Sequence, residues 1–319
     1  MAVLDQLTSQ QAIELENKYG AHNYHPLPVV LSRGEGVYVW DVEGKKYYDF
    51  LSAYSAVNQG HCHPKIVGAM VNQAQTLTLT SRAFYNDMLG KYEKFATELF
   101  GFDKLLPMNT GAEAVETALK LARKWAYEVK GIDENKAQII VCENNFHGRT
   151  TTIISFSNDP VARKNFGPYT KGFIKIEYDN LQELQETLES SNNIAAFLVE
   201  PIQGEAGVFV PSEGYLAAAK KMCEEYNVLF IADEVQYGFC RNGDFFAFVP
   251  FDKPLISNLK SLENSDKYRQ SPQVWQRWMR LRRARALVLT SMRAGSATAW
   301  IFCAAWRRAR FSSRSGAGL

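Results

Sequence analysis

Four short motifs carry residue types that can do chemistry, and each one begins a helix or follows an apolar run. The first spans residues 109–113, Asn-Thr-Gly-Ala-Glu. Thr110 is typical of a helix N-cap, and Gly111 lets a ligand approach the backbone closely. The free N–H groups of such a first turn, together with the helix dipole, can bind an anion. A capped helix start without a ligand is the alternative interpretation.

The second motif places an acid at the end of the apolar run 228–232. A continuous apolar run that ends in Asp233 predicts a carboxylate at the carboxyl edge of a buried parallel strand, where ligands bind in open α/β sheets. A carboxylate at that position can hold a cationic ring nitrogen such as a pyridinium. A helix-capping aspartate is the competing interpretation.

The third and fourth motifs span residues 145–150 and 200–207, and each follows another apolar run. In the third, Phe146 can stack on a planar ring, and Arg149 can clamp a carboxylate through two hydrogen bonds. The fourth contains two glutamates at the end of a predicted buried strand. A surface loop with a stray arginine, and glutamates that only cap or face solvent, are the alternatives.

The elements that must position these motifs are helices alternating with short apolar runs, from about residue 65 to 250. The candidate strands are 137–142, 172–176, 195–199 and 228–232, and the candidate helices are 112–127, 181–188 and 213–226. This alternation predicts βαβ crossovers and a mostly parallel sheet with both faces covered. Residues 28–50 predict a small antiparallel unit that turns at Asp41–Gly44.

Residues 251–319 differ from the rest of the chain in composition. They contain 14 Lys and Arg against 3 Asp and Glu, whereas residues 1–250 contain 22 against 31. Residues 274–314 also hold four of the six tryptophans. We predict an atypical basic tail that is disordered or translated in a wrong frame. A tail that binds nucleic acid is a further interpretation, which the lack of a nucleic-acid-binding motif disfavours.

The cysteines and the apolar runs bear on the compartment. Five cysteines are scattered without paired spacing, which favours reduced thiols. The N-terminal stretch is acidic and resembles neither a secretory signal nor a transit peptide, and no apolar run approaches the ~20 residues that span a bilayer. We therefore predict a cytoplasmic protein without membrane segments. Residues 61–63, His-Cys-His, predict no metal site, because adjacent side chains on an extended chain point to opposite sides.

Taken together, the order and spacing of the four motifs resemble those of the class III, fold-type I aminotransferases that depend on pyridoxal 5′-phosphate (PLP). Within that class the chain is similar to the ornithine aminotransferases. Three further segments carry this likeness: residues 19–28, 52–61 and 79–86. The resemblance covers about residues 12–249.

The resemblance implies an α/β fold with a seven-stranded, mostly parallel large-domain sheet. Residues 1–60 would form the N-terminal segment of the small domain, and residues 61–250 an incomplete large PLP-binding domain. A C-terminal domain would be missing. Members of the family are homodimers with the active site at the interface, so a homodimer is expected.

The resemblance also implies roles for single residues. The expected PLP-binding residues are Gly111 and Ala112 at the phosphate, Phe146 on the ring with His147 beside it, Asp233 at the ring nitrogen and Gln236 at the 3-hydroxyl. The expected substrate-binding residues are Tyr24, Tyr54, Arg149, Glu200 and Glu205, with Arg149 at the α-carboxylate and Glu205 as an acid that pairs with a second arginine.

The implied reaction moves the δ-amino group of L-ornithine to 2-oxoglutarate and gives glutamate and glutamate-5-semialdehyde, which cyclises toward proline. Asp233 and a lysine that holds the cofactor would be catalytic. The likeness dissolves after Gly243, and Lys260 is the one candidate near the expected distance. Its spacing from Asp233 is short, and the flanking small residues are absent. A truncated, catalytically inactive family member is therefore the alternative.

Overall fold

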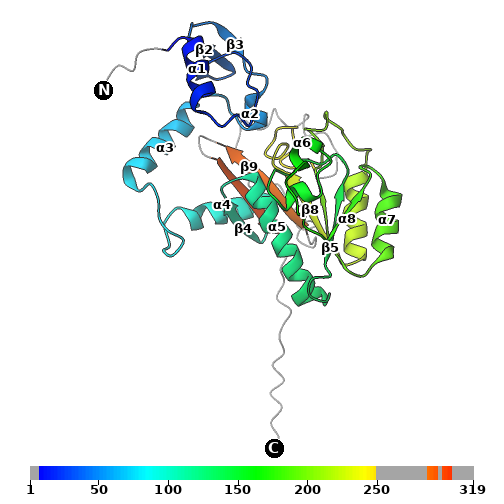
Figure 1. Cartoon of the computed structure of the whole chain (residues 1–319). Helices are drawn as coiled ribbons and strands as arrows, with labels where there is room; N and C mark the ends of the chain where they lie inside the picture. The colour runs from blue at the N-terminus through cyan, green and yellow to red at the C-terminus, as the bar shows by residue number, and fades with distance from the viewer. Residues whose placement is uncertain (1–6, 249–285, 294–296, 304–319) are drawn as a thin grey trace, which may run out of the picture. The chain divides into compact units, whose positions relative to one another are not determined.

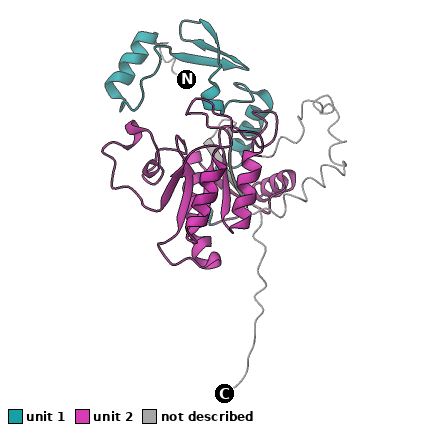
Figure 2. Ribbon diagram, turned by 90° about the vertical axis from the view of Figure 1, so that its right-hand side faces the viewer, with its two compact units in different colours: residues 1–83, 293–296 teal, residues 84–292, 297–319 magenta. Residues whose placement is uncertain are grey.

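The computed structural model describes residues 7–248, 286–293 and 297–303, which form two compact units (Figure 2). The first unit contains residues 7–83 and Arg293, and the second contains residues 84–248, 286–292 and 297–303. The units divide after Ala83, whereas the sequence predicts a boundary after residue 60.

The first unit combines three antiparallel strands with helices. Its elements are α1 (Ser9–Tyr19), β1 (Leu31–Glu35), β2 (Tyr38–Asp41), β3 (Lys46–Tyr48), α2 (Ser52–Ser55) and α3 (Pro64–Thr76). Thr8 and Gln11 form a capping box that begins α1. The strand order is β1-β2-β3, and Gly44 closes the β2–β3 turn with a left-handed φ of 87°. The predicted antiparallel unit is confirmed.

The second unit is built on a seven-stranded sheet of order β4-β10-β9-β8-β7-β5-β6 (Figure 1). Its strands are β4 (Lys104–Met108), β5 (Gln138–Cys142), β6 (Phe173–Ile176), β7 (Ile194–Val199), β8 (Leu229–Glu234), β9 (Ala286–Arg293) and β10 (Ala297–Cys303). The pairs β5–β6, β5–β7, β7–β8 and β8–β9 are parallel, and β4–β10 is antiparallel. The mostly parallel sheet is confirmed, and the four predicted strands are present with slightly shifted ends.

Helices join these strands. They are α4 (Leu89–Phe100), α5 (Gly111–Trp125), the π-helical turn η1 (Ala126–Lys130), the 3₁₀ turn η2 (Ile153–Ser155), α6 (Pro160–Arg163), α7 (Leu181–Ser190) and α8 (Tyr215–Glu225). The three predicted helices correspond to α5, α7 and α8, of which α7 and α8 lie side by side (Figure 1). In the described ranges no helix has both the length and the hydropathy of a membrane span.

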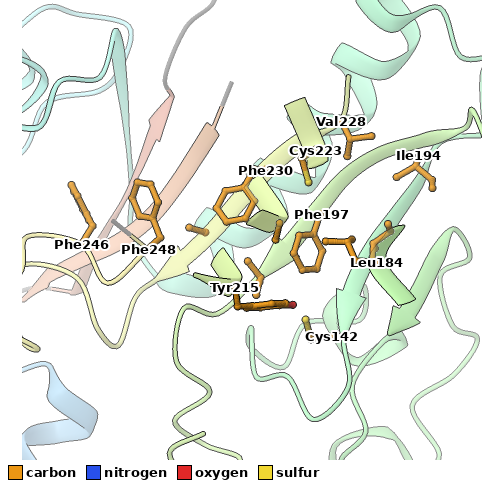
Figure 3. Packing of buried hydrophobic residues seen from close by; sticks show 14 of the residues in the cluster. Cys142, Leu184, Ile194, Phe197, Tyr215, Cys223, Val228, Phe230, Phe246 and Phe248 are labelled. Carbon is orange, nitrogen blue, oxygen red and sulfur yellow. The ribbon is translucent and has the colours of Figure 1, made fainter. Parts of the chain in front are cut away.

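Both faces of the sheet are covered, and alternate residues of each central strand show this. In β8, Phe230 packs into one core cluster with residues of α4, α7 and α8. Figure 3 shows Leu184 of α7 and Cys223 of α8 in this cluster. Ile231 packs into the other cluster, with residues of α5. The same alternation holds for Phe197 and Leu198 in β7. A strand buried on both faces reads as a continuous apolar run, which is why these strands were predictable.

Strands β9 and β10 fall within residues 251–319, to which the sequence analysis assigned no strand. β9 pairs with β8 in a register that places Leu289 opposite Asp233, and β10 pairs with β4. The runs 286–290 and 297–303 are rich in apolar and β-branched residues, which suit a sheet. Because arginines surround these runs, the segment was predicted to be a basic tail and not part of a sheet.

Candidate active site

A pocket lies in the second unit where three parallel strands end and helix α5 begins. Phe146 to Gly148 follow β5, Glu200 follows β7, and Asp233 lies near the end of β8. Parallel strands direct their carboxyl ends to one edge, so these three loops meet there. The lining residues are Gly111, Ala112, Phe146, His147, Gly148, Glu200, Asp233, Val235, Gln236 and Tyr237. All six residues expected to bind the cofactor line this pocket.

Helix α5 presents its N-terminus to the pocket. Thr110 is its N-cap and accepts a hydrogen bond from the Glu113 backbone N–H, while Glu113 accepts hydrogen bonds from the N–H groups of Asn109 and Thr110. The helix itself offers no partner to the N–H groups of its first residues. A Cβ at Gly111 would lie 3.1 Å from Val235 Cγ1, so a side chain would crowd this turn. The arrangement suits an anion bound to bare backbone.

Asp233 and His147 form a buried pair at the centre of the pocket. His147 Nδ1 lies 2.6 Å from Asp233 Oδ2, and Asp233 Oδ1 accepts a hydrogen bond from Val235 N at 3.1 Å. Burial lowers the pKa of His147, but its hydrogen bond to Asp233 and the charges of Asp233 and Glu200 outweigh burial and raise the pKa above its ordinary value. His147 Nε2 is buried and has no hydrogen-bond partner in the described part of the chain. The pair therefore orients Asp233 and leaves one polar atom unpaired.

Glu200 adds a second buried carboxyl group. Its Oε2 accepts a hydrogen bond from the Phe146 backbone N–H at 3.0 Å, which joins the loops after β5 and β7. Burial raises the pKa of Glu200 to about 7, although the charge of His147 opposes this shift. Tyr178 Oη donates to the carbonyl oxygens of Glu200 and Pro201 and so fastens the loop after β7. Glu200 is thus both a loop anchor and a proton acceptor close to neutrality.

Arg149 and Glu205 contact the residues that line the pocket. The Arg149 guanidinium lies over the Phe146 ring, 5.6 Å from its centroid. The Gln236 side-chain amide donates to Glu205 Oε1 at 3.0 Å. The structure therefore brings three of the expected substrate-binding residues, Arg149, Glu200 and Glu205, to one edge of the sheet.

The remaining expected residues are not among those that line the pocket. Tyr24 and Tyr54 belong to the first unit, where both side chains are exposed. Tyr54 sits in a left-handed turn, since Ser52 to Ser55 all have positive φ. Lys260 lies outside the described residues. In the described ranges no group of His, Cys, Asp and Glu forms a metal cluster.

Sequence reasoning gave no role to Gly148, Val235 and Tyr237, which line the pocket, or to Glu234, which is fully buried. Three of these four directly flank Asp233 and Gln236 in the chain. That adjacency was the signal that could have found them, because a tight loop after a strand brings neighbouring residues to the same edge.

The pocket suits a planar aromatic ring that carries both a cation and an anionic group. Bare N–H groups at the start of α5 can bind the anion, and a side chain at Gly111 would crowd this turn. Asp233 can face a ring cation. The Phe146 side chain offers a stacking surface, and the orphaned His147 Nε2 marks a polar group that awaits a partner. PLP, with its phosphate and its pyridinium, has these properties.

This fold and this site define a PLP-dependent aminotransferase of fold type I. The family model described as aminotransferase class-III matches residues 19–254, and the chain belongs to that family.

Among individual proteins, the chain is similar to ornithine aminotransferases. It is 64% identical over 232 residues to the mitochondrial ornithine aminotransferase of Drosophila melanogaster, covering 73% of this chain and 54% of the relative. It is 58% identical over 240 residues to that of Rattus norvegicus, covering 75% and 54%. A solved ornithine aminotransferase from Toxoplasma gondii, in which PLP partly occupies the active site, superposes with a TM-score of 0.82 at 41% identity, covering 95% of this chain and 64% of that one. The chain spans about half the length of the curated relatives it matches.

Proposed function

We propose that this chain binds PLP and carries the chemistry of an ornithine aminotransferase, the transfer of the δ-amino group of L-ornithine to 2-oxoglutarate. The products would be glutamate and glutamate-5-semialdehyde, the open-chain precursor that cyclises toward proline. The observation that carries the proposal is the meeting of Asp233, Phe146 and the N-terminus of α5 in one pocket. The names of the relatives support the choice of ornithine.

The six expected residues of the pocket would hold the cofactor, with Gln236 at its 3-hydroxyl. The N–H groups of Gly111 and Ala112 would bind its phosphate, and Phe146 would pack on its ring. When bound, PLP supplies an electron sink for the negative charge that develops on the substrate carbon. Asp233, oriented by His147, would keep a proton on the ring nitrogen, because a buried carboxylate favours a cation beside it.

The residues that the resemblance matches to substrate-binding residues would hold the substrate. We assign its α-carboxylate to the Arg149 guanidinium, which the Phe146 ring supports from below. Tyr24 and Tyr54 would position ornithine. Glu205 would act as the acid that exchanges partners between the two half-reactions, with Glu200 supporting it.

A second candidate function is binding of PLP without turnover. The pocket lining contains no lysine among the described residues, and the lysines that follow Asp233 in the sequence are Lys253, Lys260 and Lys267. The residues around Lys260 do not match the small residues that flank the family's lysine. This candidate keeps the cofactor contacts and loses the residue that would move the proton.

Reduction with borohydride separates the two candidates. The purified chain is incubated with PLP, reduced, digested and mapped by mass spectrometry. A stoichiometric phosphopyridoxyl label on Lys260, together with absorbance that changes when L-ornithine is added, supports turnover. Label spread thinly over surface lysines, with pyridoxamine 5′-phosphate still bound reversibly, supports the second candidate. Failure to bind either vitamer refutes both.

We further propose a homodimer in the cytoplasm. The dimer is supported by the family and by the exposed apolar residues of the first unit, and the compartment by the free cysteines among the described residues. The relatives from Drosophila and rat carry a mitochondrial designation, so cell fractionation is the deciding measurement. Recovery in the mitochondrial fraction would overturn the cytoplasmic assignment.

A further inference from the structure

Glu234 is a fully buried acid that the proposed chemistry does not use. It directly follows Asp233 at the end of β8, and its side chain points to the opposite face of the strand. Glu234 Oε1 accepts a hydrogen bond from the Phe248 backbone N–H at 2.7 Å. Its Oε2 is buried without a hydrogen-bond partner in the described ranges. Buried polar atoms are usually hydrogen-bonded, so the presence of an acid at this buried position needs a physical explanation.

The same residue holds the start of the loop that leaves β8. Its carbonyl oxygen accepts hydrogen bonds from the N–H groups of Tyr237 at 3.2 Å and Gly238 at 2.8 Å. The side chain thus fastens residue 248 while the main chain fastens residues 237 and 238. One residue closes the loop 235–248 at both ends, and this loop carries Gln236 and Tyr237, which line the pocket.

The interior of the loop is fastened as well. Phe239 N donates to Phe245 O at 2.6 Å, and Arg241 Nη1 donates to Gly238 O at 2.6 Å. Phe246 and Phe248 are buried in the aromatic cluster around Phe230 (Figure 3). The far end of the loop is therefore fixed to the core through apolar contacts and through Glu234.

We propose that Glu234 is a positioning residue, whose side chain and main chain close the loop 235–248 and thereby fix Gln236 and Tyr237 at the pocket. The inference rests on the proposed function, because it concerns binding of the cofactor at that pocket. A neutral carboxyl group satisfies the Phe248 N–H without leaving a charge in the core. Ionisation would bury a charge and loosen the loop.

The charges around Glu234 determine where this change falls. Burial raises the pKa of Glu234 to about 8, and the charge of Asp233 on the same strand adds to this shift. The backbone N–H groups of Ala247 and Phe248 and the charge of Arg241 in the loop oppose it. The segment 246–248 that packs against the carboxyl group adds no charged side chain. The group therefore loses its proton as pH rises through about 8.

Three forms of the full chain test the inference: the parent, E234Q and E234A, with E186A on the exposed face of α7 as a control. Affinity for pyridoxamine 5′-phosphate, which cannot react with lysines, is measured by calorimetry at pH 7 and pH 9. Hydrogen exchange of segment 246–248 is followed by mass spectrometry. Glutamine keeps the acceptor for Phe248 N–H and cannot ionise, whereas alanine removes the acceptor.

We expect E234A to bind about tenfold more weakly than the parent at pH 7 and to exchange faster at 246–248, because a buried N–H loses its partner. E234Q should match the parent at pH 7 and keep its affinity at pH 9, where the parent weakens several-fold. Unchanged affinity in E234A despite fast exchange would overturn the positioning role. The same loss at pH 9 in E234Q would overturn the role of protonation.

The exchange measurement also keeps this inference separate from the proposed function. A parent that does not bind pyridoxamine 5′-phosphate would refute the proposed function, and with it the positioning of a cofactor. Slow exchange at 246–248 that E234A leaves unchanged would refute the closure of the loop, whatever the parent binds.

Discussion

The two units bury their apolar residues to different extents. In the second unit, alternate residues of the central strands pack into cores on both faces of the sheet. Among the described residues of the first unit, Val39 and Ala56 are the buried apolar side chains, while Leu27, Phe50 and Leu79 are more than 80% exposed. The second unit thus contains its own core, whereas the described residues of the first unit bury few apolar side chains.

The carboxyl groups of the two units also differ, because their pKa values are shifted in opposite directions. In the second unit burial raises the pKa values of Glu200 and Glu234. In the first unit a hydrogen bond from Tyr47 lowers the pKa of Asp41, and hydrogen bonds from Ser9 lower that of Glu43. A buried acid costs stability when it ionises, and a hydrogen-bonded acid costs stability when it is protonated.

The largest effect is expected when one phenylalanine of each unit is truncated. Phe230 is fully buried and Phe50 is 91% exposed. F230A should lower the free energy of unfolding by about 3–5 kcal/mol, since it leaves a cavity between the sheet and its helices. F50A should change it by no more than about 0.5 kcal/mol. Urea denaturation followed by circular dichroism checks both, and equal losses would break the comparison.

The second effect concerns pH and Glu200. Its folded-state pKa of about 7 lies above the ordinary value of 4.5, so its contribution to stability falls as pH rises from 4.5 to 7. E200Q cannot ionise and keeps an acceptor for the Phe146 N–H. It should therefore exceed the parent in stability by on the order of 1–3 kcal/mol above pH 7, with the difference vanishing toward pH 4. Urea midpoints between pH 4 and pH 8.5 measure this.

Glu43 in the first unit supplies the opposite control. Its pKa is lowered by the hydrogen bonds from Ser9, so its contribution is present above pH 4.5 and is lost as pH falls. The free energy of unfolding of E43Q should be lower than that of the parent at pH 7, and the two values should converge in acid. A pH profile for E200Q with the same sign as that of E43Q would contradict the contrast between the units.

The third effect separates two aspartates of equal burial. Asp233 lies in the pocket, and Asp41 accepts hydrogen bonds from Tyr47 and Lys45 in the first unit. D233N should weaken binding of pyridoxamine 5′-phosphate by about 2 kcal/mol, because a charged hydrogen-bond partner of the ring nitrogen is removed. D41N should leave binding unchanged while it destabilises the first unit. Calorimetric titration decides, and equal affinities would remove Asp233 from the site.

The sequence predicted the second unit better than the first, for a physical reason. Strands buried on both faces leave continuous apolar runs, and Asp233 directly follows such a run. The motif that contains Gly111 was equally predictable, since an N-cap is a local signal in the sequence. The role of Glu234 was not, because it depends on Phe248, which is 14 residues away in the sequence. Strands β9 and β10 were missed because arginines surround their apolar runs in the sequence.

The smallest effect is expected when a glycine of each unit is replaced by alanine. Gly111 begins α5, and a Cβ added there would lie 3.1 Å from Val235 Cγ1. Gly68 in α3 is exposed, and a Cβ added there would have no other atom within 4 Å. G68A should stabilise the chain by about 0.5–1 kcal/mol, because alanine favours a helix, and should leave cofactor binding unchanged. G111A should weaken binding of pyridoxamine 5′-phosphate by about 1 kcal/mol, roughly fivefold, since its methyl group crowds the turn that the phosphate must approach. Thermal unfolding and calorimetric titration of both variants separate the two outcomes. If G111A bound pyridoxamine 5′-phosphate with the parent's affinity, the phosphate would not be held by the first turn of α5. The N-terminus of α5 would then no longer distinguish the second unit from the first.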